Sequence, residues 1–155
     1  MSINMGLSET QRETMAKAVT AVLADTYALY FKTHAYHWNV TGPRFHDLHG
    51  LFEAQYNELW TATDEIAEHI RALGLVAPRT YNEMAEAASI KSGGEETQAN
   101  DMLKDLVKGH EAVVATIRKA LSLADENNDE ATADLLAPRV TAHEKAAWML
   151  RSTIG

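Results

Sequence analysis

The sequence predicts an all-α protein, a four-helix bundle with a short extra helix in the crossover between the second and third long helices. Apolar residues make up 46% of the 155 residues and recur at steps of three and four along four long stretches, which is typical of amphipathic helices. Only three prolines and eight glycines interrupt the chain. Strand-like alternation, repeats and low-complexity tracts are absent from the sequence, so residues 1–155 are expected to form a single domain.

The first long helix is expected over residues 8–40. Ser8 has the residue type of an N-cap, and Gln11 stands where it completes a capping box. The pair Gly42-Pro43 then ends the helix. Its predicted buried stripe contains Met15, Val19, Val22, Thr26, Leu29, Thr33 and His37.

The second long helix is expected over residues 45–73, where Gly74 stops it. A short helix over residues 81–89 is expected in the crossover, between Pro78 and the pair Gly93-Gly94. The predicted buried stripe of the long helix contains Leu48, Phe52, Leu59, Thr63, Ile66, Ile70 and Leu73.

The last two long helices are expected over residues 97–123 and 130–153, with the segment DENND as the turn between them. Pro138 falls inside the fourth helix, where a proline costs about 3 kcal/mol, so a kink or a late start is expected. The predicted stripe of the third helix contains Met102, Leu106, Val113, Ile117 and Leu121.

Composition excludes several classes of protein. The chain has no cysteine, which excludes disulfides, iron–sulfur clusters, thiolate zinc sites and a cysteine nucleophile. The net charge of −8 disfavours binding to nucleic acid or to anionic membranes, because both need excess lysine and arginine. No apolar run reaches the roughly 20 residues that span a bilayer, and the first residues lack the order of a signal peptide. A cytoplasmic location is therefore expected.

Ligand-type side chains share one face of the second helix. His49 and Glu53 are one turn apart, and so are Asp64 and Glu68; all four fall within an arc of about 100°. His37, near the end of the first helix, is expected to fold back beside His49. Inward-pointing imidazoles and carboxylates at helical spacing are typical of metal sites in bundles.

One chain cannot bring all of these side chains to one ion. The helical rise separates His49 from Asp64 by roughly 22 Å, whereas a metal–ligand bond is about 2 Å long. A second copy of the helix, antiparallel across a twofold axis near Glu58 and Leu59, would create two equivalent shared sites. The alternative is that the carboxylates are solvated surface residues and the histidines are hydrogen-bonded core residues, which is the commoner role of each residue type alone.

Longer motifs resemble those of a known family. HWNVTG begins at His37, FHDLHGLFE at Phe45 and DEIAE at Asp64; LGLVAPRTYNE follows the second helix, and HEKAAWML begins at His143. Together they resemble the signature of the Dps family within the ferritin-like superfamily, over nearly the whole chain. The resemblance implies a ferritin-like bundle and a hollow homododecamer built on twofold dimers.

The resemblance also implies an activity. Dps proteins are ferroxidases that oxidise Fe(II), preferentially with hydrogen peroxide rather than dioxygen, and store ferric oxyhydroxide inside the shell, which protects the cell from oxidative stress. The family's iron ligands, which are also its catalytic residues, carry over to His37 and His49 on one side and to Asp64 and Glu68 on the other. Glu53 stands where the family often has aspartate, so it is expected either to shift the ion or to act through water.

Other residues receive weaker roles from the resemblance. Trp38 is expected to pack at the interface, with quenching of stray oxidising equivalents as a second role. Glu126, Glu130 and Asp134 match a region that lines threefold iron pores in the family, although a solvated loop and helix cap is the plainer interpretation. The remaining histidines are expected to be structural, exposed or, near the site, second-layer groups: His34, His46, His69, His110 and His143.

Three alternatives stay open. The chain could be a DNA-compacting protein, as the family name suggests, although the segment before Ser8 carries no basic residue and the net charge is −8. It could be a structural four-helix oligomer that holds zinc, since zinc generally outcompetes Fe(II) for such donors. A di-iron site within one bundle is the third, but it needs Glu-x-x-His pairs, which the sequence lacks.

Overall fold

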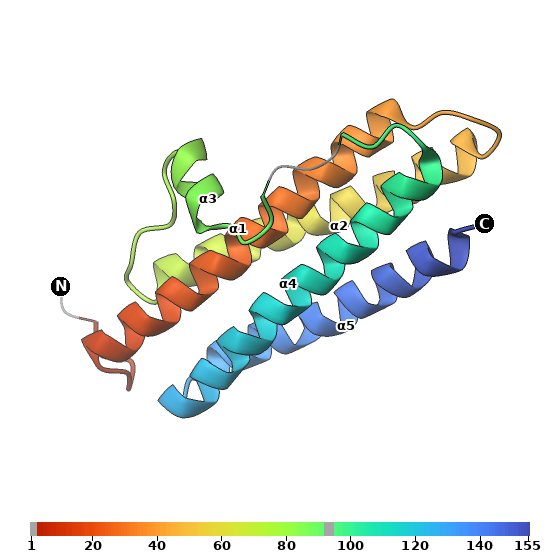
Figure 1. The fold of residues 1–155 in the computed structure, drawn as a ribbon. Coiled ribbons are helices and arrows are strands. Elements are labelled where there is room, and N and C mark those ends of the chain that lie inside the picture. Colours follow the sequence, from red (N-terminus) through yellow and green to blue (C-terminus); the bar gives the residue numbers. More distant parts are fainter. Residues whose placement is uncertain (1–2, 92–94) are drawn as a thin grey trace.

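The computed structural model describes residues 3–91 and 95–155 and confirms a four-helix bundle with a short helix in the crossover (Figure 1). No strand occurs within these two ranges. The pair Gly93-Gly94, which was expected to limit the short helix on its C-terminal side, lies outside the described residues. The helices are α1 (Glu9–Asn39), α2 (Phe45–Ala72), α3 (Tyr81–Ala87), α4 (Ala99–Asn127) and α5 (Glu130–Thr153).

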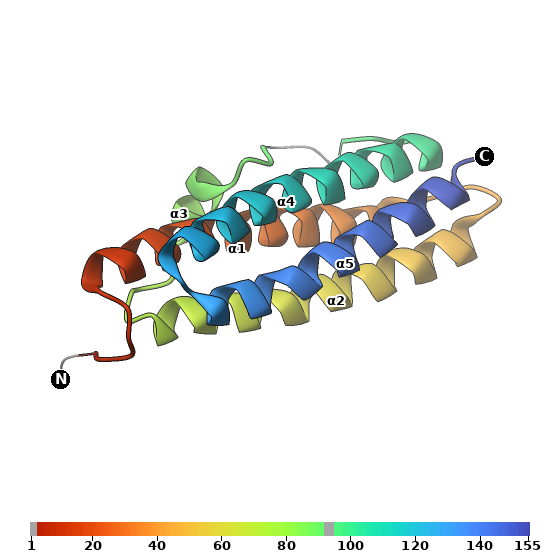
Figure 2. The same cartoon turned by 90° about the horizontal axis from the view of Figure 1, so that it is seen from below.

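The long helices form two antiparallel hairpins that pack against each other. Helix α1 packs on α2 and α4 on α5, while α1 also contacts α4 and α2 contacts α5. Figures 1 and 2 show that the crossover carries the chain back along the bundle, so that α2 and α4 run in the same direction. In Figure 2, α2 and α5 lie side by side and run in opposite directions. This arrangement sets which residues of α2 and α5 lie at the same level.

The start of α1 confirms the predicted capping box. The Ser8 hydroxyl accepts a hydrogen bond from the Gln11 amide at 3.2 Å, and the Ser8 amide donates to Gln11 Oε1 at 2.9 Å. The same Gln11 side chain donates to the carbonyl of Asn127 at 3.0 Å. The cap therefore also ties the start of α1 to the end of α4.

The predicted apolar stripes form the core. Every residue of the stripes predicted for α1 and α2 is buried, and the stripe of α4 is buried except Leu121, which is partly buried. Burial of this kind stabilises the bundle by about 25 cal/mol per Å² of apolar surface removed from water. Periodicity alone was sufficient to find these faces because a helix repeats its direction every 3.6 residues.

Three boundaries differ from the prediction by two or more residues. Helix α4 begins at Ala99 and continues to Asn127 instead of spanning 97–123, and α3 ends at Ala87 rather than at 89. DENND is therefore mostly helical. Helix α4 ends where Asn128 adopts a left-handed conformation (φ 54°), which asparagine tolerates better than most residues.

Helix α5 begins at Glu130 as predicted and continues through Pro138, so of the two effects expected of this proline, a kink or a late start, the late start does not occur. A proline inside a helix removes one backbone hydrogen bond, and Leu136 and Arg139, on either side of Pro138, are both buried. The other expected effect of Pro138, a kink in the axis of α5, stays a prediction.

A buried carboxylate holds the crossover against the bundle. Asp25 on α1 is fully buried and accepts hydrogen bonds from the Ser89 and Ile90 amides at 2.6 and 3.0 Å. The hydroxyls of Ser89 and Thr116 donate to its other oxygen at 2.7 and 2.6 Å. One side chain thus connects α1, the crossover and α4.

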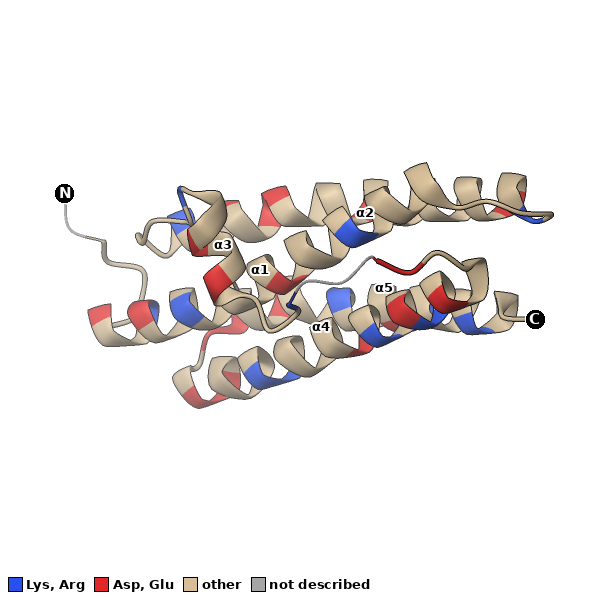
Figure 3. Cartoon of the chain, turned by 45° about the horizontal axis from the view of Figure 1, so that its top comes forward, with Lys and Arg blue, Asp and Glu red and all other residues tan. Residues whose placement is uncertain are grey.

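Charged residues of both signs are interspersed along the helices, and the face in Figure 3 has no continuous basic stretch. None of the helices in the described ranges is long and apolar enough to cross a membrane.

Candidate metal centre

The hairpin between α1 and α2 brings His37 and His49 into direct contact, as predicted. Helix α1 ends at Asn39, and the turn contains Gly42 with φ 106°, a conformation that favours glycine. The two imidazoles stack with ring centroids 3.7 Å apart and an interplanar angle of 18°. His37 is buried and His49 is half-buried.

Reciprocal hydrogen bonds orient both rings. His37 Nδ1 donates to the carbonyl of His49 at 2.8 Å, and His49 Nδ1 donates to the carbonyl of His37 at 2.8 Å. A carbonyl only accepts, so each Nδ1 must carry the proton. In the neutral rings each Nε2 therefore keeps a free lone pair, and ligand histidines in metal sites are usually oriented by this kind of backbone bond.

The predicted carboxylate ligands lie on the outer surface of α2. Glu53, Asp64 and Glu68 are all exposed, and none forms an ion pair within 3–91 and 95–155. Asp64 and Glu68 are one turn apart on one face, as the spacing predicts. Asp64 also lines an open groove of about 620 Å³ with Tyr27 and Trp60.

The structure does not bring the histidine pair and the two distal carboxylates together within one chain. No group of three or more histidine, aspartate or glutamate side chains gathers into a metal-sized cluster in the part of the chain that is described. Helical geometry separates the two halves by roughly 22 Å along α2. Each half is therefore incomplete as a metal site.

Aromatic side chains surround the histidine half. Tyr56 stacks on His34 at 3.8 Å and lies 5.1 Å from His37, edge to face. Trp38 packs against His34 at 4.3 Å, yet 58% of its surface is exposed. Burial lowers the pKa of His34, with a further decrease from the neighbouring His37. His34 thus contributes to the packing around the pair, whereas His46 is exposed.

The α4–α5 turn places the predicted pore residues on two helices. Glu126 belongs to α4, while Glu130 and Asp134 belong to α5, and their role in a pore stays a prediction. The left-handed Asn128 between them breaks the periodicity. All three carboxylates are exposed.

His69 has a role in this turn that the sequence did not indicate. Its Nε2 is 2.7 Å from the hydroxyl of Thr132, which donates in turn to the buried carboxylate of Asp129, the N-cap of α5. Burial lowers the pKa of His69, and the Asp129 charge partly offsets this effect. The imidazole therefore connects the end of α2 to the start of α5.

A second group of polar residues was also missed. Glu58, Arg139, His143 and His110 form one connected network inside the bundle. Each comes from a different turn or helix, so no short motif reveals it. The one available signal is the four-residue spacing of Arg139 and His143 on α5.

Comparison with known proteins agrees with this architecture. The family model of the ferritin-like domain matches residues 16–155. The chain is 39% identical to DNA protection during starvation protein 2 of Bacillus anthracis, over 89% of this chain and 97% of that protein.

Solved structures are similar over the whole fold. The Dps protein of Vibrio cholerae O1 superposes with a TM-score of 0.93 and 33% identity, covering 100% of this chain and 98% of that one. That protein is described as a member of a broad superfamily of ferritin-like diiron-carboxylate proteins. Dps from Bacillus brevis superposes with a TM-score of 0.88 and 33% identity, covering 94% of this chain and 98% of that one. Similarity to a diiron-carboxylate protein supports iron sequestration in general. The family model, the sequence identity and the superposed structures together show that the chain belongs to the Dps family of ferritin-like proteins.

Proposed function

We propose that this protein is a ferroxidase that oxidises Fe(II), preferentially with hydrogen peroxide, and stores the ferric product inside a hollow shell of its own subunits. Each oxidation site is shared by two chains across a twofold axis. His37 and His49 come from one subunit, and Asp64 and Glu68 come from its partner, with Glu53 beside the histidines. A dodecamer in the cytoplasm is part of the same proposal.

The observation that carries the proposal is the oriented histidine pair. Two neutral imidazoles with free Nε2 lone pairs suit Fe(II), and reciprocal backbone bonds fix their orientation before any ion arrives. The pair alone supplies too few donors, and the carboxylates of the same helix are too far away. A second copy is the simplest source of the missing oxygen ligands.

The surface beside the candidate ligands supports an interface there. Three large side chains expose two-fifths or more of their surface: Trp38 (58%), Phe45 (43%), whose ring lies 4.9 Å from that of His49, and Trp60 (55%), which lines the Asp64 groove. Exposed aromatic groups of this size are typical of protein–protein contacts. An antiparallel pair of α2 helices would bury these side chains on both subunits, because a twofold interface uses the same surface of each subunit.

The chemistry follows from the ligand set. Carboxylates favour Fe(III) over Fe(II) because the extra positive charge gains more from anionic partners. Two Fe(II) ions each give one electron to one hydrogen peroxide, which takes up two protons and leaves as two waters. A site with few protein ligands keeps positions open for the peroxide.

Mixed assembly tests the shared site directly. Subunits that carry His37→Ala and His49→Ala are co-assembled in equal amounts with subunits that carry Asp64→Asn and Glu68→Gln. Neither variant alone has an intact site, whereas random pairing restores the complete ligand set in about one quarter of the positions. The readout is the ferric absorbance after anaerobic Fe(II) loading and addition of peroxide. Recovery near one quarter of the wild-type rate supports the proposal, and no recovery from correctly assembled mixtures refutes it.

The two other functions have separate tests. A zinc-holding structural oligomer would bind Zn²⁺ at the same donors but show no ferric absorbance after peroxide. DNA binding is suggested by the name of the Bacillus anthracis relative, while the net charge of −8 opposes it. Duplex retardation that persists at moderate salt in a gel-shift assay would favour the DNA-binding function.

A further inference from the structure

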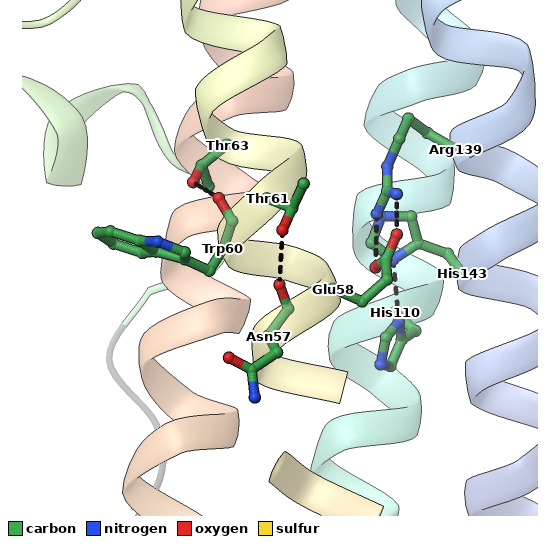
Figure 4. Close-up of polar contacts among 8 residues, drawn as sticks. All are labelled: Asn57, Glu58, Trp60, Thr61, Thr63, His110, Arg139 and His143. Atoms are coloured by element: carbon green, nitrogen blue, oxygen red, sulfur yellow. Dashed lines mark hydrogen bonds and ion pairs between the residues drawn. The ribbon is translucent and has the colours of Figure 1, made fainter. Parts of the chain in front are cut away.

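A polar network links α2, α5 and α4. Arg139 on α5 forms a two-pronged ion pair with the carboxylate of Glu58 on α2, in which Nη2 is 3.0 Å from Oε2 (Figure 4). The same Nη2 is 3.3 Å from Nε2 of His143, one turn further along α5. His143 Nδ1 is 2.9 Å from Nδ1 of His110 on α4. The side chain of Arg139 is only 11% exposed.

The donor directions in this network follow from Arg139. A guanidinium only donates, so His143 Nε2 must present a lone pair to it. Neutral His143 then carries its proton on Nδ1 and donates to His110 Nδ1, which leaves the His110 proton on Nε2. Burial lowers the pKa of His110 to about 4 and that of His143 to about 2, and both rings are neutral at physiological pH.

The guanidinium of Arg139 therefore occupies a position between two side chains that could both donate to a metal ion. One of its nitrogens lies between a carboxylate oxygen and an imidazole lone pair, at 3.0 and 3.3 Å. A carboxylate and an imidazole are common donors to divalent metals, and His143 has the outer hydrogen bond to His110 that ligand histidines usually have. The bonds would have to shorten to about 2 Å, which requires the side chain of Glu58, 48% exposed, to move toward His143.

A further donor lies at the same level of the bundle. Gln55 is three residues before Glu58 on α2, and His143 is four residues after Arg139 on the antiparallel α5. Since Glu58 and Arg139 are paired, Gln55 is level with His143. Both amide atoms of Gln55 and Nε2 of His110 are buried without a hydrogen-bond partner among the described residues. Unpartnered buried polar atoms are uncommon in folded proteins, and each calls for a physical explanation.

We propose that Glu58 and His143, supported by Gln55 and His110, form a latent divalent-metal site that Arg139 occupies with its own charge. Arg139 is then a specificity-determining residue, because it closes this position between α2 and α5 to the ions that the chain is proposed to oxidise elsewhere. Figure 4 shows Trp60 leaving α2 on the side opposite to Glu58, so the latent site and the Asp64 groove lie on different faces of α2.

The test counts Co²⁺ in a background that lacks the proposed interface ligands through His37→Ala, His49→Ala and Asp64→Asn. Addition of Arg139→Gln, or of Arg139→Met, which keeps an apolar stem, is expected to add about one Co²⁺ per subunit in equilibrium dialysis, with visible d–d absorption. The background alone should not bind this ion. Because the readout does not involve iron oxidation, it stands or fails independently of the ferroxidase proposal.

Two controls isolate the site. Lys104→Gln removes an equal charge from the exposed Lys104–Asp101 pair and should add no site. Further substitution of Glu58→Gln or His143→Gln in the Arg139→Gln protein should remove the added Co²⁺. The proposal is overturned if Arg139→Gln and Arg139→Met, folded by circular dichroism, bind no more Co²⁺ than the background. It is equally overturned if the added Co²⁺ survives loss of both Glu58 and His143.

Discussion

Replacement of Asp25 by alanine tests the connection that holds the crossover against the bundle. The carboxylate is fully buried and accepts four hydrogen bonds, two from amides and two from hydroxyls. The donors belong to Ser89 and Ile90 in the crossover and to Thr116 on α4. Asp25→Ala therefore leaves donors from two other segments unpaired at once.

The expected loss can be worked from these contacts. A hydrogen bond to a charged group contributes about 1.5–3 kcal/mol, but the four are not additive because loss of the carboxylate also removes its own desolvation cost. A buried donor left without a partner costs about 1–3 kcal/mol, and Asp25→Ala leaves several such donors, so a loss of about 3–5 kcal/mol in unfolding free energy is expected. Ser89→Ala removes only one of the donors and keeps both amides, so about 1–2 kcal/mol is expected.

Urea unfolding followed by circular dichroism measures both losses, at one fixed subunit concentration because assembly raises apparent stability. Amide hydrogen exchange at Ser89 and Ile90 should increase in Asp25→Ala before the bundle unfolds. The reasoning is refuted if Asp25→Ala lies within 1 kcal/mol of the wild type. It is refuted as well if Ser89→Ala costs as much as Asp25→Ala, since a single hydroxyl would then account for the whole connection.

Four further outcomes are expected. Because burial lowers the pKa of His110 to about 4 and of His143 to about 2, below the unfolded value of about 6.5, the unfolded chain binds protons first as the pH falls. The stability from this pair is complete above about pH 6.5 and is lost below it by up to about 2.7 kcal/mol per pH unit, a slope that His143→Gln should reduce in urea titrations. Phe52→Ala in the core should cost about 3–5 kcal/mol in the same assay. Ser8→Ala should cost about 1 kcal/mol through loss of the α1 cap, and a loss below the error of the fit would contradict the capping argument. In peroxide-dependent iron oxidation, Glu53→Asp should stay near the wild-type rate while Glu53→Gln falls about 10–100-fold; equal rates would remove Glu53 from the proposed site.

Most of the fold could be predicted because its signals are local. The capping box at Ser8 and Gln11 and the apolar stripes of α1 and α2 involve residues three or four apart, and all were found in the structure. The prediction failed at the end of α4, where DENND looked like a turn. Left-handed Asn128 ends the helix one residue before Asp129, and because Asn127 is the same residue type, residue type alone did not decide which asparagine ends it.

The histidine half of the candidate site could also be predicted, since the hairpin that joins α1 and α2 is short enough to bring His37 beside His49. The reciprocal backbone bonds could not, because they depend on how both helix ends are rotated. The expected pore residues Glu126 and Glu130 lie on different helices, α4 and α5, and their role in a pore stays a prediction.

The sequence by itself determined the helices, their buried faces, the ligand types on α2 and the impossibility of one chain joining His49 to Asp64, because each follows from helical period and rise. Only the tertiary structure decided which buried polar groups meet: Asp25 with Ser89, and Glu58 with Arg139. Those partners are 64 and 81 residues apart, so their contact depends on the register between helices. That register is set by packing of the whole core and leaves no periodic trace in the chain.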